Sequence, residues 1–204
     1  MKSVLISIQP YWVFLIIAKL MGWEIDKNKI IEVRKNFPKA EDWNKLVKIY
    51  CSKDKNSFNL ISKAYQPLMQ KFLGKVIGEF VCDSIICSQA YFDSQGKNHL
   101  TNIFEEDIKR TCLTEYELWN YIAGKAVKSN QMYDGYLWHI SDLKIYDKPK
   151  DLSEFKKPCD RFLDCITCKR LVRNDFLSCD NKITRPPQSW CYVEKNKNEQ
   201  ATEL

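Results

Sequence analysis

Glycine and histidine are scarce in this chain, whose 204 residues include 6 glycines and 2 histidines. These few glycines form no loop of the kind that cradles the phosphates of a nucleotide. No combination of serine, histidine and acidic residue stands out as a nucleophilic triad. The sequence therefore carries no signature of a P-loop enzyme or of a serine hydrolase.

A long hydrophobic run is also missing. The most apolar stretch, SVLISIQPYWVFLIIA, is divided by a Gln-Pro pair into a six-residue piece and an eight-residue piece. A membrane-spanning helix needs about 20 apolar residues. Lys19, Met21 and Trp23 stand where a signal peptide would have small residues for cleavage. We therefore expect no membrane association and a cytoplasmic, reducing location.

The composition is that of a globular protein, with 45% hydrophobic and 28% charged residues. A chain of this length can bury a core without disulfides. Its net charge of +6 is compatible with an acidic partner such as nucleic acid, although many basic proteins have none. We expect a single domain over residues 1–194, followed by a flexible polar tail over 195–204.

The periodicity of apolar residues predicts an α+β protein. Strands are predicted at 4–8, 29–37, 46–52, 76–92, 135–146 and 188–194, and helical segments at 11–21, 58–74 and 101–124. Segment 76–92 is long enough to bend or to pair twice, and Gly78 within it indicates a bulge or a close backbone approach. Thr114 and Glu117 have the spacing of a helix capping box. Strands and helices do not alternate regularly, which disfavours a doubly wound sheet.

Four of the nine cysteines are clustered near the C-terminal end. They are Cys159, Cys165, Cys168 and Cys179. The central C-x-x-C pair is a common source of two zinc thiolates, and four sulfur ligands would close the coordination shell of a structural zinc. Cys191 could replace one ligand, and free or buried thiols are the alternative. We expect residues 156–182 to form a zinc-binding insertion ordered by its metal.

Several segments resemble ASCH-domain proteins of the PUA-like superfamily. They are SIQPYWVFLIIAKLMGWEIDKNKIIEVRK, GKVIGEF, WHISDLKIYDKP and PPQSWCYV. The resemblance is greatest to the small ASCH proteins of phages and prophages of low-GC Gram-positive bacteria. It implies a small, mostly closed β-barrel with flanking helices, and a cleft beside a strand with the motif K-x-x-E-x-R. Lys29, Glu32 and Arg34 occupy that motif, whereas Lys27 replaces a glycine expected two residues before the lysine.

The resemblance implies that this cleft holds RNA, a modified base or a nucleotide-like ligand. Glu32 and Arg34 are two apart on a strand, so they share a face and could present an acceptor beside a bidentate donor. A surface salt bridge is the alternative for this pair. The other candidate ligand-binding residues are Lys35, Trp12, Trp138, His139 and Trp190. Aromatic rings can stack on bases, but such rings and a strand histidine are more often structural.

Two other functions remain open. Some small ASCH proteins are amidohydrolases that act on N4-acetylcytidine with a lysine, a threonine and a glutamate. Lys29 matches that lysine, but Glu32 stands in the threonine position. A lysine can act as a base only if burial lowers its pKa. The third possibility is an accessory protein that binds a host protein. We expect recognition of RNA or a modified nucleotide rather than catalysis.

Overall fold

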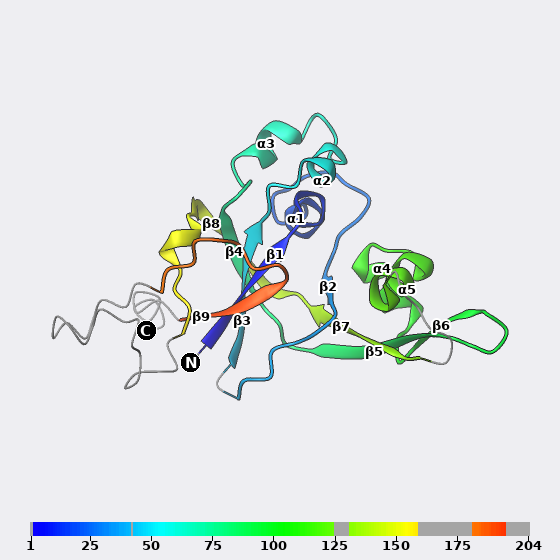
Figure 1. Cartoon of the computed structure of the whole chain (residues 1–204). Helices are drawn as coiled ribbons and strands as arrows, with labels where there is room; N and C mark the ends of the chain where they lie inside the picture. The colour runs from blue at the N-terminus through cyan, green and yellow to red at the C-terminus, as the bar shows by residue number, and fades with distance from the viewer. Residues whose placement is uncertain (1, 42, 125–130, 159–180, 195–204) are drawn as a thin grey trace.

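The computed structural model describes residues 2–41, 43–124, 131–158 and 181–194, which adopt an α+β fold (Figure 1). The strands are β1 (Lys2–Ile8), β2 (Ile31–Arg34), β3 (Trp43–Cys51), β4 (Val76–Val81), β5 (Ile85–Phe92), β6 (Asn98–Thr101), β7 (Tyr133–His139), β8 (Ser141–Lys150) and β9 (Trp190–Glu194). The helices are α1 (Pro10–Ile17), α2 (Lys55–Asn59), α3 (Gln66–Gln70), α4 (Glu105–Thr111), α5 (Glu115–Ala123) and the 3-10 helix η1 (Leu152–Glu154). The four clustered cysteines and the tail over 195–204 lie outside the described residues.

The strands form two sheets. The five-stranded sheet has the order β8-β4-β3-β1-β9, in which only β1 and β3 are parallel. The four-stranded sheet has the order β2-β7-β5-β6 and is antiparallel throughout. Within the described ranges neither sheet closes on itself, so the mostly closed barrel expected from the family resemblance is not formed. Instead, the chain passes from one sheet directly into the other at two places.

Two strand pairs make this crossing together. β4 continues into β5 through residues 82–84, and β7 continues into β8 through Ile140. β4 pairs with β8 in one sheet, and β5 pairs with β7 in the other. The prediction that 76–92 pairs twice is confirmed, whereas the single strand predicted over 135–146 is two strands. Gly78 is a point of close approach, because a Cβ placed on it would lie 2.2 Å from the carbonyl oxygen of Lys144.

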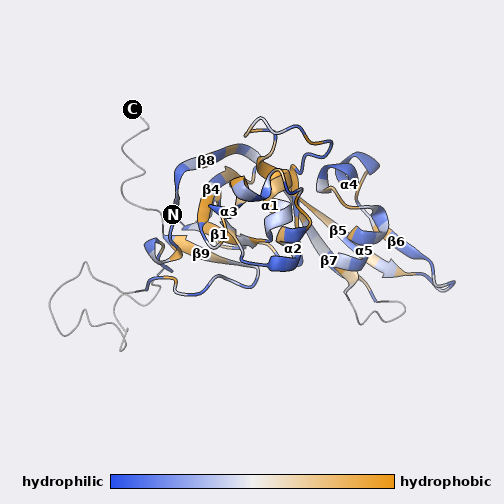
Figure 2. Ribbon diagram, turned by 90° about the horizontal axis from the view of Figure 1, so that it is seen from above, coloured by the Kyte–Doolittle hydropathy of each residue, from blue (hydrophilic) through white to orange (hydrophobic). Residues whose placement is uncertain are grey.

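Helix α1 covers one face of the five-stranded sheet (Figure 1). It begins at Pro10, whose fixed φ and missing N–H suit the first turn of a helix. Its apolar residues, including Val13 and Ile17, pack with strand residues such as Ile6 and Ile49 in the largest core cluster. Figure 2 shows this concentration of hydrophobic residues in α1 and the strands beneath it. The helix ends at Ile17, earlier than the predicted residue 21.

The prediction of a single helix over 58–74 is wrong. The chain forms two five-residue helices there, α2 and α3, with non-helical residues between them. Asp54 caps α2 through a hydrogen bond from the backbone N–H of Ser57, and Pro67 lies in the first turn of α3. Proline is excluded from a helix interior because it lacks an N–H and clashes with the preceding turn. Pro67 therefore starts a helix instead of lying within one.

Helices α4 and α5 pack on the four-stranded sheet. The helical segment predicted over 101–124 divides at Cys112, whose φ of +62° ends α4. The predicted capping box is confirmed at the start of α5, where Thr114 and Glu117 bond reciprocally. Leu118 and Ile122 of α5 pack with Ile31 in a second core cluster. In the described part of the chain, no helix is long and apolar enough to cross a membrane.

Candidate functional site

A cavity of about 560 Å³ lies where three parts of the fold meet. One wall is β2, the second is the turn from β1 into α1, and the third is α5. Lys29, Glu32 and Arg34 line it together with Trp12 of α1. The structure therefore brings the three K-x-x-E-x-R residues and one predicted aromatic residue to a single cavity.

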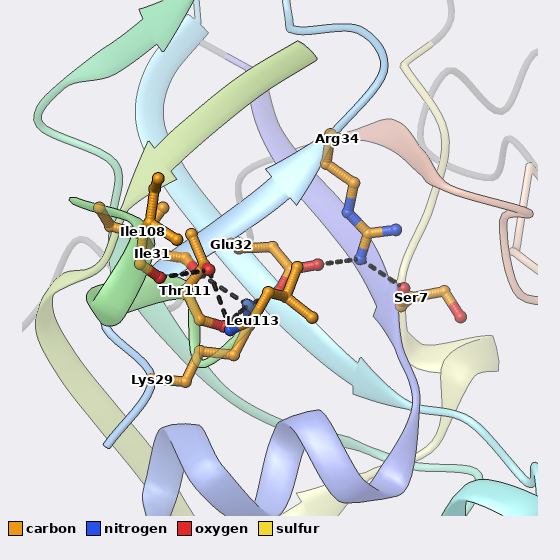
Figure 3. A network of polar contacts seen from close by, with 8 residues as sticks. All are labelled: Ser7, Lys29, Ile31, Glu32, Arg34, Ile108, Thr111 and Leu113. Atoms are coloured by element: carbon orange, nitrogen blue, oxygen red, sulfur yellow. Dashed lines mark hydrogen bonds and ion pairs between the residues drawn. The ribbon is translucent and has the colours of Figure 1, made fainter. Parts of the chain in front are cut away.

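Lys29 is held by acceptors from three directions (Figure 3). Its Nζ donates hydrogen bonds to the carbonyl oxygens of Ile31, at 2.7 Å, and Thr111, at 3.0 Å. It also lies 3.4 Å from Oε2 of Glu32 and 5.2 Å from the centre of the Trp12 ring. An ammonium group has three donors, and these three oxygens can occupy all of them. Lys29 is thus built into the floor of the cavity.

Glu32 links Lys29 to Arg34. Its Oε1 lies 2.9 Å from Nη2 of Arg34, and the same Nη2 donates to the carbonyl oxygen of Ser7 at 2.8 Å. Glu32 is 6% exposed and Arg34 is 8% exposed, so this is not the surface salt bridge considered as an alternative. The alternation of β2 accounts for the arrangement, because Ile31 and Val33 point into the core on the opposite face.

One donor of Arg34 is left over. Among the described residues, its buried Nε has no hydrogen-bond partner. A buried donor without an acceptor costs about 1–3 kcal/mol. An acceptor atom that reached Nε from the cavity would remove that cost. The guanidinium group therefore keeps one donor that no described residue uses, although Nε itself exposes almost no surface.

Charge is distributed unevenly over the cavity. The floor has the two cations Lys29 and Arg34 against the single carboxylate of Glu32, whereas Asp54 and Glu117 line other parts of the wall. Both of these acids also cap helices, Asp54 at α2 and Glu117 at α5. The cavity thus combines a positive floor with acidic groups elsewhere on its wall, which does not favour a polyanion filling it.

Burial changes the acid–base properties of Lys29. Removal of the ammonium group from water lowers the pKa of Lys29 below its ordinary value of 10.5, and the carboxylate of Glu32 opposes that shift. The neutral amine is therefore more accessible here than on an exposed lysine. This property could not be read from the sequence, because it depends on how deeply the residue is enclosed.

The other four candidate ligand-binding residues do not line this cavity. Trp138 is 0% exposed and packs in the core, with ring centres 6.2 Å from Trp43 and from Trp190. Trp190 is partly buried, and its indole N–H donates to Oδ1 of Asn36 at 2.7 Å. These two tryptophans, one from each sheet, therefore pack against each other where the sheets meet. Trp138 pairs with Glu32 across the β2–β7 ladder, and Trp190 pairs with Ile6 across the β1–β9 ladder.

His139 and Lys35 lie further along the same two strands. Nδ1 of His139 is 2.7 Å from Oδ1 of Asp83, where both strand pairs cross between the sheets. This is the hydrogen-bonded strand histidine considered at the outset. Lys35 follows β2, is exposed, and reaches Gly124, where a Cβ would lie 2.9 Å from its Nζ.

Sequence reasoning missed the backbone acceptors and one wall of the site. Ser7 and Thr111 accept from Arg34 and Lys29 although they are 27 and 82 positions away along the chain. Tyr121 of α5 lines the cavity without having been a candidate. The sequence signals for α5 were its helical character and its capping box, which indicate a helix and its start but not that Tyr121 faces this cavity.

The residues at the two ends of the cysteine-rich segment are described, although its four clustered cysteines are not. Lys156 and Lys182 form an antiparallel bridge, and the N–H of Lys157 donates to the carbonyl oxygen of Asn181 at 2.9 Å. The two ends of the segment therefore lie side by side on the protein. Among the described residues, no group of histidine, cysteine or acidic side chains has an arrangement that could hold a metal.

Comparison with protein-family models, with curated proteins and with solved structures finds no match for this chain. What it binds must therefore be inferred from its own residues.

Proposed function

We propose that this chain is an ASCH-type, PUA-like domain that binds a base of RNA or of a modified nucleotide in the cavity beside β2. The observation that carries the proposal is the burial of Lys29, Glu32 and Arg34 together on the cavity floor, with Nε of Arg34 unpartnered among the described residues. Charged residues are rarely buried without a structural or functional reason. The ASCH resemblance places the same three residues in a ligand cleft.

The contacts suggest different tasks for the three residues. Arg34 is the main ligand contact, because its guanidinium group has five donors. Nη2 contacts Glu32 and Ser7, the Tyr121 side chain is a further hydrogen-bond partner, and Nε has no partner among the described residues. Glu32 is fixed between two cations and supports Arg34. Lys29 balances the charge of Glu32 and orients it. Trp12 supplies an aromatic surface on which a base can stack.

The charge distribution supports a base rather than a phosphate inside the cavity. A phosphate would lie within reach of Asp54 and Glu117 as well as of the two cations. A neutral base has no such conflict, and its carbonyl and ring nitrogens can accept from Arg34. The phosphates of the ligand would then remain outside.

The proposal is tested by fluorescence anisotropy with labelled single-stranded RNA, single-stranded DNA and duplex DNA, comparing wild type with Arg34→Gln. Loss of a charged hydrogen bond should weaken binding of a single strand about 10-fold or more. Arg110→Gln is the matched control, because this arginine lies on the surface of α4. Circular dichroism melts establish that both variants fold. Equal affinity of wild type and folded Arg34→Gln would contradict the proposal, as would no binding to any probe.

A second candidate is the amidohydrolase, which the lowered pKa of Lys29 favours. In its neutral form Lys29 could take a proton from a water that attacks the acyl carbon of an N4-acylated cytidine. The C–N bond would break as Lys29 returns this proton to the departing nitrogen, giving the free 4-amino group and a carboxylic acid, which then loses its proton to solvent. Incubation with N4-acetylcytidine, followed by chromatography, should then show cytidine and acetate with wild type and neither with Lys29→Ala. The rate should rise with pH as Lys29 loses its proton. No product with wild type would dismiss this function.

We also infer that the insertion over 156–182 holds a structural zinc through Cys159, Cys165, Cys168 and Cys179. These cysteines lie outside the described residues, and the support comes from their spacing and from the bridged base of the segment. A closed base and a metal-bound tip would together order a segment that has little apolar material of its own.

A further inference from the structure

Two further hollows lie beside the cavity along α5. A hollow of about 940 Å³ lies against this helix, and Glu117 and Tyr121 line both it and the cavity. A third hollow, of about 600 Å³, shares Asn98, Tyr116 and Trp119 with the second. The three depressions therefore adjoin one another along α5, and together they form a surface that we call the α5 track. It runs from β2 across α5 to the hairpin of β5 and β6, which lie beside α5 in Figure 1.

The α5 track exposes two aromatic rings. Tyr116 is 65% exposed and Tyr121 is 40% exposed, although the apolar residues of α5 are buried on its other side. The amides of Asn98 and Asn120 lie in the same hollows. The two tyrosines therefore share this hollow with two amide residues and do not form a continuous apolar patch.

Two lysines lie along the α5 track. Lys97 lines the far hollow in the hairpin, and Lys35 lies close to Gly124, which lines the middle hollow at the C-terminal end of α5. Glu115 and Glu117 lie between them, so the track as a whole is not strongly basic. A ligand that fits this pattern makes few phosphate contacts and gains most of its affinity from its flat rings.

We propose that the α5 track carries the nucleotides that flank the base held in the cavity, as a single strand. This inference rests on the proposed function and specifies its ligand as an oligonucleotide rather than an isolated nucleoside. Tyr121 borders the cavity, so a strand leaving it meets this ring first and Tyr116 after it. A duplex would hide the base faces that these rings need. The bases stack on the tyrosines, and Lys35 and Lys97 each take one phosphate.

The experiment measures binding of a fluorescein-labelled pool of randomised single-stranded RNA hexamers, with a DNA pool alongside, by anisotropy. Unlabelled nucleosides compete for the same site. In Tyr116→Ala one base loses the ring on which it stacks, so this variant should bind the hexamers about 5- to 150-fold more weakly than wild type does. Tyr116→Phe keeps the ring and should bind like wild type. Phe104→Ala is the matched control, because it removes a 79% exposed ring outside the track.

Two further readouts separate the α5 track from the cavity. Nucleoside competition should be unchanged in Tyr116→Ala and reduced in Arg34→Gln, because only the latter alters the cavity. The salt dependence should be shallow, with a slope of log affinity against log salt of about −1.4 for two phosphate contacts on a single strand. A basic surface with many phosphate contacts would give a much steeper slope.

Two results would contradict the proposed role of the α5 track without contradicting the proposed binding site in the cavity. In the first, hexamer affinity falls in Arg34→Gln but changes less than 2-fold in Tyr116→Ala. The exposed tyrosines would then be assigned to contact with a protein partner. In the second, a hexamer binds no more tightly than a nucleoside. A pool that does not bind at all, or that binds folded Arg34→Gln as it binds wild type, would overturn the proposed function and the α5 track together.

Discussion

At the scale of single residues, Lys29 shows how a cation is accommodated inside this protein. Its ammonium group contacts two backbone carbonyl oxygens and the carboxylate of Glu32, and the aromatic ring of Trp12 lies nearby. Glu32 in turn contacts Arg34. A buried network of this kind is costly to interrupt, because its remaining polar groups lose a partner that water cannot replace.

Replacement of Lys29 by methionine should destabilise the protein by about 1–3 kcal/mol, since the carbonyl oxygens of Ile31 and Thr111 lose this buried donor while Glu32 keeps Arg34. The measurement is urea unfolding followed by circular dichroism. Lys109→Met is the matched control, because Lys109 forms an exposed pair with Glu105 on α4 and should have little effect. Similar unfolding midpoints for the two variants would mean that the buried network does not stabilise the fold.

Glu79 gives the protein a predictable response to acid. Burial alone would raise the pKa of Glu79, but hydrogen bonds from Lys48 and Tyr146 outweigh it and hold the pKa below the ordinary value of 4.5. The stability gained from this carboxylate is therefore present above pH 4.5 and is lost as the pH falls through its folded-state pKa. The stability difference between wild type and Glu79→Gln should shrink in urea unfolding below pH 4.5. A constant difference from pH 7 to pH 3 would contradict this explanation.

At the scale of elements, the β4–β8 ladder depends on a residue without a side chain. An alanine at Gly78 would place its Cβ against the carbonyl oxygen of Lys144, which cannot move without distorting the ladder. Gly78→Ala should cost about 1–3 kcal/mol and accelerate hydrogen exchange at β4 and β8. Gly96→Ala is the control, because no atom lies within 4 Å of that Cβ and its strain is local to a turn. Unchanged protection of β4 and β8 in Gly78→Ala would contradict the prediction.

The sequence allows prediction of elements whose signal is local. The alternation of β2 correctly placed Glu32 and Arg34 on one face, and the capping box correctly marked the start of α5. The close approach at Gly78 was also anticipated. Each of these depends on residues within a few positions of one another, and short-range geometry determines them.

Elements that depend on distant partners were missed or wrongly bounded. Strand β6 exists through its pairing with β5, and its short polar sequence NHLT carries no strand pattern. The division of 135–146 at Ile140 reflects a change of sheet, which periodicity cannot report. In the same way, the motif identified Lys29, Glu32 and Arg34, whereas their acceptors and the α5 wall follow from tertiary packing alone.

At the scale of the whole molecule, the cysteine-rich segment is attached to the outer face of the five-stranded sheet. Phe155 and Ile183 flank it and belong to a third core cluster with Leu5, Tyr50 and Val193. Loss of order in the segment would therefore disturb the packing of Phe155 and Ile183 against the five-stranded sheet. A metal bound there would stabilise more than its own loop.

We accordingly expect about one zinc per chain in protein purified without added metal, measured by elemental analysis. Cys165→Ser should lose this zinc and lower the thermal unfolding midpoint, as should a strong chelator added to wild type. Cys87→Ser is the matched control, because this cysteine is exposed on β5 and distant in sequence from the cluster. Metal-free wild-type protein with an unchanged midpoint in chelator would rule out the zinc.

The position of β1 has a consequence for how the protein is made. β1 lies between β3 and β9, so its second neighbour is formed by residues 190–194. During translation β1 leaves the ribosome before the other described elements, and β9 follows only after all of them have been synthesised. The nascent chain must therefore keep one edge of an apolar strand unpaired until late, which favours slow folding and creates a need for protection by chaperones.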